Sequence, residues 1–323
     1  MFFTNSAQTS SSNVEKLDLE NGNTLRILTF NTWYFGKKVE NGLDKIVKHI
    51  KLLKPDIVAL QEIQTASLFK EFLKKLGTEW SGITTPNEYP DIGIITKHTI
   101  DDKTLSITPC NKSMGVNIQL KNSSEIISFW GMHLDHHSYG PYAANNRLVT
   151  KMEQIFSGES TKNKTGRQDN IHELLQTKEF MMAIEDSGKI PVIVAGDFNT
   201  PSHLDWIKEN KEIHAGWIIQ WPATYLLHSK TGLIDSFREI YPSPIETPGD
   251  TWTTINRYGP EWDFSIPDTL DRIDYILYKS RRLKPFKSFV YSGNELLQQV
   301  PNHEKNDYPS DHNAVVTDFS WVT

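Results

Sequence analysis

The sequence predicts a layered α/β fold with mixed β-sheets. Strand-like apolar runs and amphipathic helical stretches interleave irregularly, and some predicted strands follow one another directly. This order favours mixed sheets over a purely parallel, doubly wound sheet. The 323 residues, 37% of them hydrophobic, can bury a sizeable core, and no internal repeat or Pro/Gly-rich linker divides them. We therefore expect residues 23–323 to form a single domain after a flexible, Ser- and Asn-rich lead-in of residues 1–22.

Periodicity predicts the elements in order along the chain. The run from Leu25 to Phe30 alternates and is rich in β-formers, which predicts a strand that ends near Asn31. Residues 42–54 place their apolar side chains on one helical face, and Pro55 ends that helix. By the same criteria, further strands are predicted at residues 56–60, 92–96, 115–120, 126–132, 192–195, 272–278, 286–291 and 314–319. Further helices are predicted at residues 68–76, 146–156 and 171–184, with an exposed loop at residues 157–170.

Charge and composition argue against several classes of protein. The net charge is -6, from 34 basic and 40 acidic residues, whereas a dedicated duplex-DNA binder usually carries a basic excess. The single cysteine, Cys110, rules out an intramolecular disulfide and a zinc-thiolate site. No apolar run approaches the roughly 20 residues of a membrane span. We expect a soluble chain, monomeric by default, and either cytoplasmic or exported after removal of a signal not present in this sequence.

Polar residues suited to a hard cation or a phosphate stand at the ends of the predicted strands. In α/β architectures these ends face the functional crevice. Alone, Asn31 would also fit a turn or a helix cap, and Glu62 would also fit a solvent-facing strand end. The full set comprises Asn31, Gln61-Glu62, His133, Asp135, Asp197, Asn199, Asp271 to Asp274, and Ser310-Asp311-His312.

The run Gly196-Asp197-Phe198-Asn199 is the sharpest of these signals. A long apolar strand delivers a glycine, which allows close backbone approach, and then two oxygen-bearing side chains one residue apart. Asp197 and Asn199 can therefore point into one site, although an Asx turn would use the same residues.

Two histidines have candidate carboxylate partners. His133 and Asp135 lie two residues apart in a strand, so both fall on the same face of it. Asp274 is flanked by strand-forming apolar residues and needs a partner when buried, and His312 is the natural candidate. The histidines at 136–137 extend the first cluster, but their spacing matches no recognised zinc pattern.

The candidate ligands are carboxylate and amide oxygens. This hard set favours Mg²⁺, with Mn²⁺ as a substitute, over zinc or copper. Such an ion acts as a Lewis acid on phosphoryl oxygens and stabilises a leaving oxygen. From the residues alone we therefore predict a metal-assisted hydrolase.

Taken together, the motifs resemble those of the endonuclease/exonuclease/phosphatase superfamily, to which deoxyribonuclease, exonuclease III and neutral sphingomyelinase belong. Each motif alone is weak, but all six occur in the family's order over nearly all of residues 24–323. The resemblance implies a four-layer α/β sandwich with two central mixed β-sheets flanked by helices. The matching pieces are Thr29 to Trp33, Leu60 to Glu62, His133 to Asp135, Gly196 to Asn199, Asp271 to Tyr275, and Ser310 to His312.

The resemblance also implies a metal site. Glu62 is implied as the main Mg²⁺ ligand, with Asn31 and Asp311 near the same ion. Between the first histidine and the Gly-Asp-Phe-Asn motif the family often has a Tyr and an Arg, which we match to Tyr142 and Arg147 as phosphate-side contacts. Trp252 is similar to a family aromatic near the site, although it would equally pack a long loop.

The remaining roles concern water and phosphate. Asp197, held beside Asn199, is implied to orient or deprotonate the attacking water. His312, paired with Asp274, is implied as the phosphate-binding or general-base histidine, and His133 as a second histidine on the phosphate. A phosphodiester or monoester would then be attacked in line by water.

Three classes of function stay open for such a chain. The acidic balance favours a hydrolase of a small phosphoester, either a phosphodiesterase or a phosphatase. The alternative is a metal-dependent DNA or RNA nuclease, for which residues 279–287 are the dense basic stretch. A non-catalytic binding protein on the same fold is disfavoured because the motif set is complete.

Overall fold

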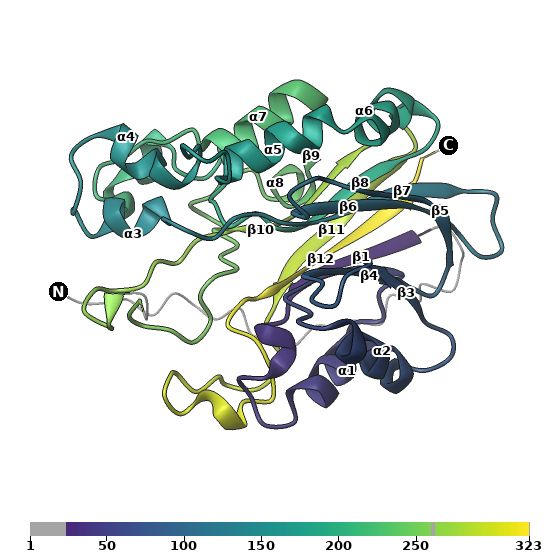
Figure 1. Ribbon diagram of the computed structural model, residues 1–323. Helices are drawn as coiled ribbons and strands as arrows, with labels where there is room; N and C mark the ends of the chain where they lie inside the picture. Colours follow the sequence, from purple (N-terminus) through teal and green to yellow (C-terminus); the bar gives the residue numbers. More distant parts are fainter. Residues whose placement is uncertain (1–23, 260–261, 323) are drawn as a thin grey trace.

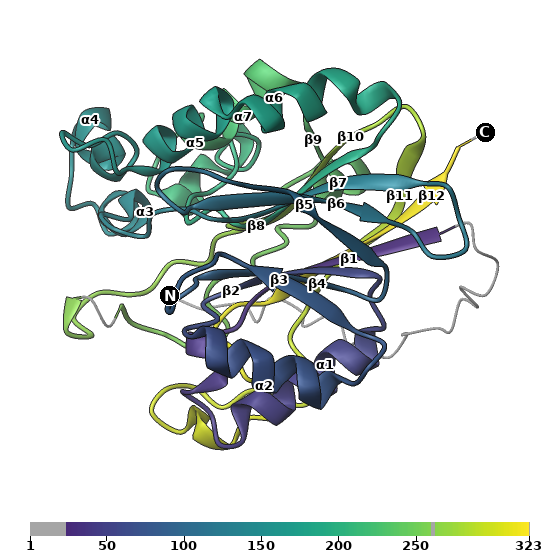
Figure 2. The ribbon, with the colours of Figure 1, turned by 45° about the vertical axis from the view of Figure 1, so that its right-hand side comes forward.

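The computed structural model describes residues 24–259 and 262–322, so the predicted lead-in of residues 1–22 lies outside the described residues. Two mixed six-stranded sheets pack face to face, and helices cover both outer faces (Figures 1 and 2). This four-layer α/β sandwich confirms the predicted fold class. Within the described ranges, no helix is both long and apolar enough to cross a membrane.

The two sheets have the same kind of strand arrangement. Only β1 with β2 and β7 with β8 pair in parallel among the described strands, and the other pairs are antiparallel. The first sheet runs in the order β11 (Leu283–Tyr291), β12 (Ala314–Trp321), β1 (Thr24–Asn31), β2 (Ile57–Gln61), β4 (Ile92–Thr96) and β3 (Ser81–Thr84). The second runs in the order β5 (Thr99–Ile107), β6 (Ser113–Gln119), β7 (Ile126–His133), β8 (Val192–Asp197), β10 (Asp274–Lys279) and β9 (Ile234–Asp235).

Alternation along the strands divides the apolar side chains between an inner and an outer core. Ile27 in β1 faces the layer between the sheets, where it joins Phe129 from β7. Leu28, the next residue, faces the helices α1 (Gly42–Leu53) and α2 (Ala66–Leu76) on the outer side. The second sheet is covered by α5 (Arg167–Gln176), α6 (Lys178–Glu185) and α7 (Pro222–Thr231) (Figure 1).

The predicted helix at residues 146–156 is wrong. The chain instead forms two short helices, α3 (Gly140–Asn145) and α4 (Met152–Ile155). Pro141 is the second residue of α3, where its fixed φ suits the first turn. Two residues beyond the end of α3, Arg147 adopts a left-handed backbone conformation with φ 57°, so the helix does not continue.

The predicted exposed loop at residues 157–170 is confirmed only in part, because residues 162–165 are exposed and outside any helix or strand, whereas both flanks include buried residues. Helix α5 begins at Arg167, and the predicted helix at residues 171–184 is broken at Thr177 into α5 and α6. Glu159, Arg167 and Asp169 are buried, because each charged group has polar partners within the segment or beneath it. The polar composition of the two flanks therefore reflects paired charges, and that of residues 162–165 reflects solvent exposure.

Several elements were missed by periodicity. Strand β5 is half exposed and carries charged residues at 101–103, so no apolar alternation marks it. Helix α7 buries only a few of its residues. Strand β3 is short and partly exposed, and α8 (Ser236–Ile240) is a helix of five residues.

Candidate active site

One edge of the sandwich gathers the polar strand ends. Strands β1 and β2 end in parallel at Asn31 and Gln61, and β7 and β8 end in parallel at His133 and Asp197. The antiparallel neighbours β4, β10 and β12 begin at the same edge, so residues just before or at their first positions join the group. Both sheets therefore contribute side chains to one site.

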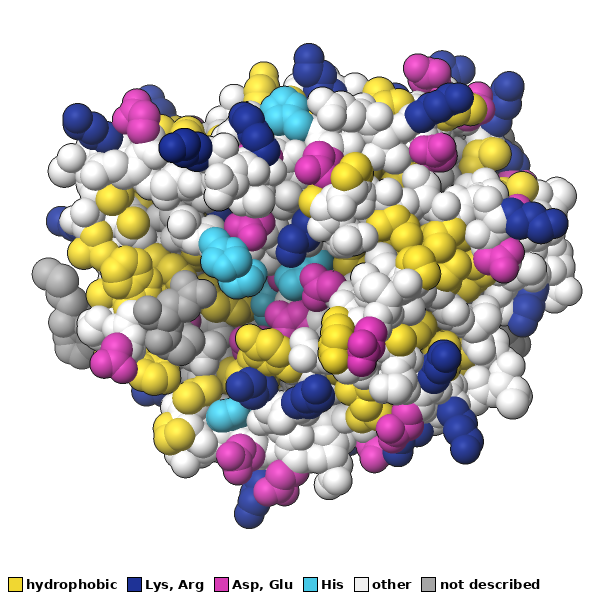
Figure 3. All heavy atoms as spheres, viewed as in Figure 1, with side chains coloured by type: hydrophobic (Ala, Val, Ile, Leu, Met, Phe, Trp, Pro, Cys, Tyr) yellow, Lys and Arg dark blue, Asp and Glu magenta, His cyan; other side chains and the backbone are white. Residues whose placement is uncertain are grey.

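These side chains form the floor of a cleft of about 600 Å³. Histidine and acidic side chains gather in this hollow near the middle of the face drawn in Figure 3. The walls include aromatic side chains, and Lys38 and Lys112 also line the cleft. The sequence-predicted residues on its surface are Asn31, Glu62, His133, Tyr142, Asp197, Asn199, Trp252, Asp311 and His312.

Asp197 is the most central carboxylate of the cleft. Its Oδ2 accepts a hydrogen bond from Asn31 Nδ2 at 2.9 Å, and its Oδ1 accepts one from the backbone N–H of Asn199 at 2.8 Å. Burial raises the pKa of the Asp197 carboxyl, and repulsion from Asp274 raises it further, while the two histidines and Asn31 oppose the rise. A carboxylate with a raised pKa is suited to accept a proton from water.

His133 lies on one side of Asp197, with its Nε2 3.7 Å from Asp197 Oδ2. Its Nδ1 is 2.7 Å from Oδ2 of Asp91. Burial alone would lower the pKa of His133, but Asp91, and then Asp197 and Glu62, outweigh burial and raise it to about 9. The imidazole is therefore protonated at neutral pH. Asp135 does not pair with His133 as the spacing had suggested, and bonds His137 instead.

His312 lies on the other side of Asp197, with its Nε2 3.8 Å from the same Oδ2. Its Nδ1 is 2.9 Å from Oδ2 of Asp274, so the predicted Asp274–His312 pair is present. Burial would lower the pKa of His312, but Asp274 and then Asp197 raise it to about 10. Asp197 thus stands between two imidazolium groups, each backed by its own carboxylate.

Glu62 and Asp311 lie at the part of the cleft that the sequence predicts to hold a cation. Glu62 Oε2 accepts from the backbone N–H of Tyr34 at 2.6 Å, and its Oε1 is 3.3 Å from Asn31 Nδ2. Asp311 is buried, and its Oδ1 has no hydrogen-bond partner among the described residues. Burial raises the pKa of Asp311 to about 7, with repulsion from Glu62 and Asp197 adding to it although His312 opposes.

This donor set fits a divalent cation. A buried carboxylate oxygen without a partner is costly, and a cation beside it and Glu62 would offset that cost. Asn31 turns its amide nitrogen toward the carboxylates, while its Oδ1 accepts from the backbone N–H of Trp33 at 3.0 Å. Its place as a direct ligand therefore stays a prediction.

A second group of possible ligand atoms lies in the same floor. Single donor atoms of Asp197, Asp274 and His312 all fall within 4.8 Å of one another. Within this group His312 Nδ1 is hydrogen-bonded to Asp274 Oδ2, so we interpret these three residues as an ion-pair network that backs the cleft.

The backbone after β1 is shaped to hold Glu62. Trp33, Tyr34 and Phe35 all adopt left-handed conformations, with φ of 46°, 55° and 55°. Such residues are strained, and three in a row turn the Tyr34 N–H toward Glu62. The strain therefore serves the geometry of the carboxylate.

The predicted substrate contacts are only partly brought together. Tyr142 and Trp252 line the cleft, and their rings lie 5.9 Å apart at an edge-to-face angle. Arg147 is exposed and is not among the cleft-lining residues. Arg147 lies in a left-handed turn after α3. The arginine that reaches the loop beneath the cleft is Arg167, which donates to the Asn199 carbonyl oxygen.

The sequence reasoning missed several residues of the site. Asp91 directly precedes β4, so the strand-end rule that selected Asp274 would have selected it once β4 was known to run antiparallel to β2. Lys112, by contrast, comes from the loop before β6 and carries no signal in the sequence.

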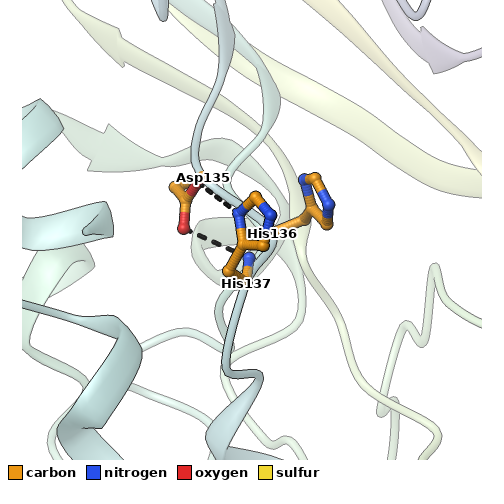
Figure 4. A group of neighbouring side chains, drawn as sticks. All are labelled: Asp135, His136 and His137. Atoms are coloured by element: carbon orange, nitrogen blue, oxygen red, sulfur yellow. Dashed lines mark hydrogen bonds and ion pairs between the residues drawn. The ribbon is translucent and has the colours of Figure 1, made fainter. Parts of the chain in front are cut away.

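The histidines at 136–137 form a stacked pair at the rim of the cleft. Asp135 turns toward His137, and His136 lies to the side (Figure 4). Donor atoms of the three residues fall within 4.8 Å of one another. The two rings stack with centroids 4.1 Å apart, and Asp135 already accepts from His137. Face-to-face rings do not converge on a common ion, so this group is not a second metal site in our interpretation.

Comparison with known proteins identifies the class of protein. The sequence profile described as Endonuclease/Exonuclease/phosphatase family matches residues 28–312. The chain therefore belongs to this family, whose members hydrolyse phosphoesters. It is also 45% identical over 303 residues to Uncharacterized protein F14F9.5 of Caenorhabditis elegans, which covers 93% of this chain and 92% of that protein.

Solved structures support the fold. The chain is similar to D. rerio TDP2 complexed with single strand DNA product, at 16% identity and a TM-score of 0.57, over 92% of this chain and 99% of that one. It is also similar to the human Nocturnin catalytic domain with bound sulfate anion, at 19% identity and a TM-score of 0.54, over 93% and 94% of the two chains. At these identities the likeness extends to the fold alone.

Proposed function

We propose that the protein is a Mg²⁺-dependent hydrolase of a phosphoester, with water attacking in line at phosphorus and Mn²⁺ as a possible substitute. The observation that carries this proposal is the position of Asp197 between His133 and His312, next to the carboxylates of Glu62 and Asp311. A base, two cationic hydrogen-bond donors and an anionic cation site in one cleft match the needs of phosphoryl transfer.

The residues would divide the work as follows. Asp197 holds and deprotonates the attacking water, and the Asn199 N–H fixes the orientation of its carboxylate. Protonated His133 and His312 donate to the phosphoryl oxygens, where negative charge develops. Because the pKa of His312 is raised to about 10, the phosphate-binding role suits it better than that of general base.

The cation would be held by Glu62 and Asp311, with Asn31 beside them. When bound there, Mg²⁺ supplies Lewis-acid stabilisation of the leaving oxygen. Tyr142 and Trp252 wall the cleft and would contact the substrate next to the phosphate. Asp274 and Asp91 keep the two imidazoles charged and oriented.

A small substrate is favoured over a nucleic acid. The basic stretch at residues 279–287 begins at Lys279, where β10 ends. Lys279 is five residues along the strand from Asp274 and thus about 17 Å from the cleft. Two of its cations are engaged in ion pairs, Arg282 with Glu125 and Lys284 with Glu239. This stretch is therefore poorly placed to hold a nucleic acid over the site, which weakens the nuclease alternative.

The test is hydrolysis of bis-p-nitrophenyl phosphate with MgCl₂ by the purified chain and its variants. Glu62→Ala and His312→Ala should each abolish turnover while the circular dichroism spectrum is unchanged. Glu125→Ala and His98→Ala are matched controls, because both residues lie in turns at the opposite edge of the sheets. Wild-type turnover in either site variant would refute the assignment.

A parallel screen separates the substrate classes. The same enzyme is assayed with p-nitrophenyl phosphate, plasmid DNA and sphingomyelin. Efficient plasmid cleavage at low enzyme concentration, lost in Glu62→Ala, would replace our preference by the nuclease alternative. No Glu62-dependent hydrolysis of any of the substrates would favour a non-catalytic binding protein.

A further inference from the structure

A buried ion pair lies beneath the cleft without lining it. The side chains of Arg167 and Glu159 are 1% and 3% exposed, and Arg167 Nη1 is 3.9 Å from Glu159 Oε1. Both residues come from the segment 157–170, which joins the short helix α4 to the start of α5. Removing two charges from water costs free energy, so we asked which groups this buried pair contacts.

Arg167 joins the two loops that follow the central parallel strands. Its Nε donates to the carbonyl oxygen of Asn199, in the loop after β8. Its Nη2 donates to the carbonyl oxygen of His136 at 3.1 Å, in the loop after β7. The guanidinium also lies over the ring of Tyr139, 5.7 Å from the centroid. One planar group thus contacts three points of the cleft's underside.

Glu159 also contacts the loop after β8. Its Oε1 accepts from Thr200 Oγ1 at 3.1 Å, one residue beyond the carbonyl that Arg167 holds. The two residues therefore form a clamp that holds the Asn199 carbonyl and the neighbouring Thr200 side chain. The backbone N–H of Asn199 in turn donates to Asp197, so the clamp lies one residue from the proposed base.

Close packing around the pair leaves room only for glycine at position 158. A Cβ on Gly158 would clash with Arg167 Nη1 and with the carbonyl oxygens of His137 and Ser138. The loop after β7 thus packs closely against Gly158 and the Arg167 guanidinium. Small displacements of Arg167 would be transmitted to this loop, because packed interiors do not deform freely.

We propose that Arg167, paired with Glu159, is a positioning residue for phosphoester hydrolysis that sets the place of the Asp197 carboxylate and of the cleft wall at residues 136–139. It acts through Asn199 and is not a catalytic residue, since it is not among the residues that line the cleft. This inference rests on the proposed function. A planar fork that donates to two carbonyls in different directions is required, which a lysine cannot supply.

The test compares Arg167→Lys and Arg167→Met with two control variants, Arg26→Lys and Arg26→Met. Arg26 pairs with Asp318 at 2.6 Å in the part of β1 that lies away from the site, and its side chain is 13% exposed. Turnover of bis-p-nitrophenyl phosphate and the melting temperature are measured for all four variants. We expect Arg167→Lys to lower kcat by about 10- to 100-fold with KM within about twofold of wild type.

The controls separate positioning from stability. The Arg26 variants should lose a similar amount of thermal stability and keep the wild-type kcat. If Arg167→Lys also keeps the wild-type kcat when assayed well below its melting temperature, the positioning role is overturned. Glu159→Gln, which keeps the Thr200 contact but removes the charge, should lower kcat less than Arg167→Met does.

A crystal structure of Arg167→Met provides a readout that needs no activity. We expect the Asn199–Thr200 peptide to move by about 1 Å, the scale at which misplacement lowers rates. A peptide that superposes on its present position overturns the inference, whatever the substrate. A failure of Glu62→Ala to affect turnover would instead overturn the proposed function and leave this structural test standing.

Discussion

Replacing Asp274 by asparagine separates the charge of the site from its shape. Asp274 Oδ2 lies 2.9 Å from His312 Nδ1, and both side chains are almost fully buried. Asparagine has the same shape and keeps an acceptor, but it does not keep the His312 imidazole positively charged. The variant therefore tests whether the proposed phosphate donor works as an imidazolium.

The expected loss in kcat/KM follows from the attraction between Asp274 and protonated His312, and the expected stability from the repulsion between Asp274 and Asp197. At 2.9 Å a charge pair in a protein is worth about 6 kcal/mol with an effective dielectric constant of about 20. If about half to two-thirds of that attraction supports charged His312 in the transition state, kcat/KM should fall by about 100- to 1000-fold, since each 1.4 kcal/mol is about tenfold. Stability should change little, because the variant also removes the repulsion between Asp274 and Asp197 that raises the pKa of Asp197.

The assay is hydrolysis of bis-p-nitrophenyl phosphate together with a thermal melt. Asp235→Asn serves as the control. Asp235 is a buried carboxylate in strand β9 of the same sheet, its side chain pairs with Arg272 at 2.6 Å, and it lies outside the cleft. The control should lower the melting temperature and leave kcat/KM near wild type. A kcat/KM for Asp274→Asn within about threefold of wild type would refute the reasoning.

Three other outcomes are expected. Chelation with EDTA should abolish hydrolysis, and titration with MgCl₂ or MnCl₂ should restore it, with Glu62→Gln needing more metal for half-maximal rate; EDTA-resistant turnover would contradict the cation site. Burial lowers the pKa of His214 to about 4. At pH values between about 6.5 and 4 only the unfolded state binds the proton, so the free energy of unfolding should fall as the pH drops through this range. Urea titrations should show a weaker fall for His214→Gln. Phe129→Ala should lower the free energy of unfolding by about 3–5 kcal/mol in the same titrations, because it empties the layer between the sheets; a loss under about 1 kcal/mol would contradict that packing.

The fold and most of the site could be predicted because strand ends leave a strong local signature. Asn31, His133 and Asp197 each follow an apolar run, and the parallel pairs β1 with β2 and β7 with β8 bring such ends to one edge. The Asp274–His312 pair was predictable for a different reason, because a carboxylate among strand-forming residues must find a partner. Both inferences use only sequence neighbours and a general rule.

The rest depended on tertiary contacts that no local pattern encodes. Asp91 became visible only once β4 was known to run antiparallel to β2. Arg167 lies in a polar segment that reads as an exposed loop, and its burial depends on Glu159, eight residues earlier, and on carbonyl groups from two distant loops. Arg147 was matched to a family arginine that lies between the first histidine and the Gly-Asp-Phe-Asn motif. Arg167 lies in the same interval, and sequence order alone cannot tell an exposed arginine from a buried one.

Asn31 shows why the site needs both sheets at once. It ends β1 in the first sheet, yet its amide nitrogen donates to Asp197 at the end of β8 in the second and lies 3.3 Å from Glu62 after β2. The carboxylates proposed for the water and for the cation are thus joined through one amide. Because Ser310 Oγ also donates to the Asn31 carbonyl at 2.7 Å and accepts from the His312 N–H at 3.0 Å, the phosphate-side histidine is tied to the same point. Glu62 and His312 adjoin strands of the first sheet, whereas Asp197 ends a strand of the second. The packing of the two sheets therefore sets where the base lies relative to the cation site and to His312, and a shift of one sheet against the other would change both distances.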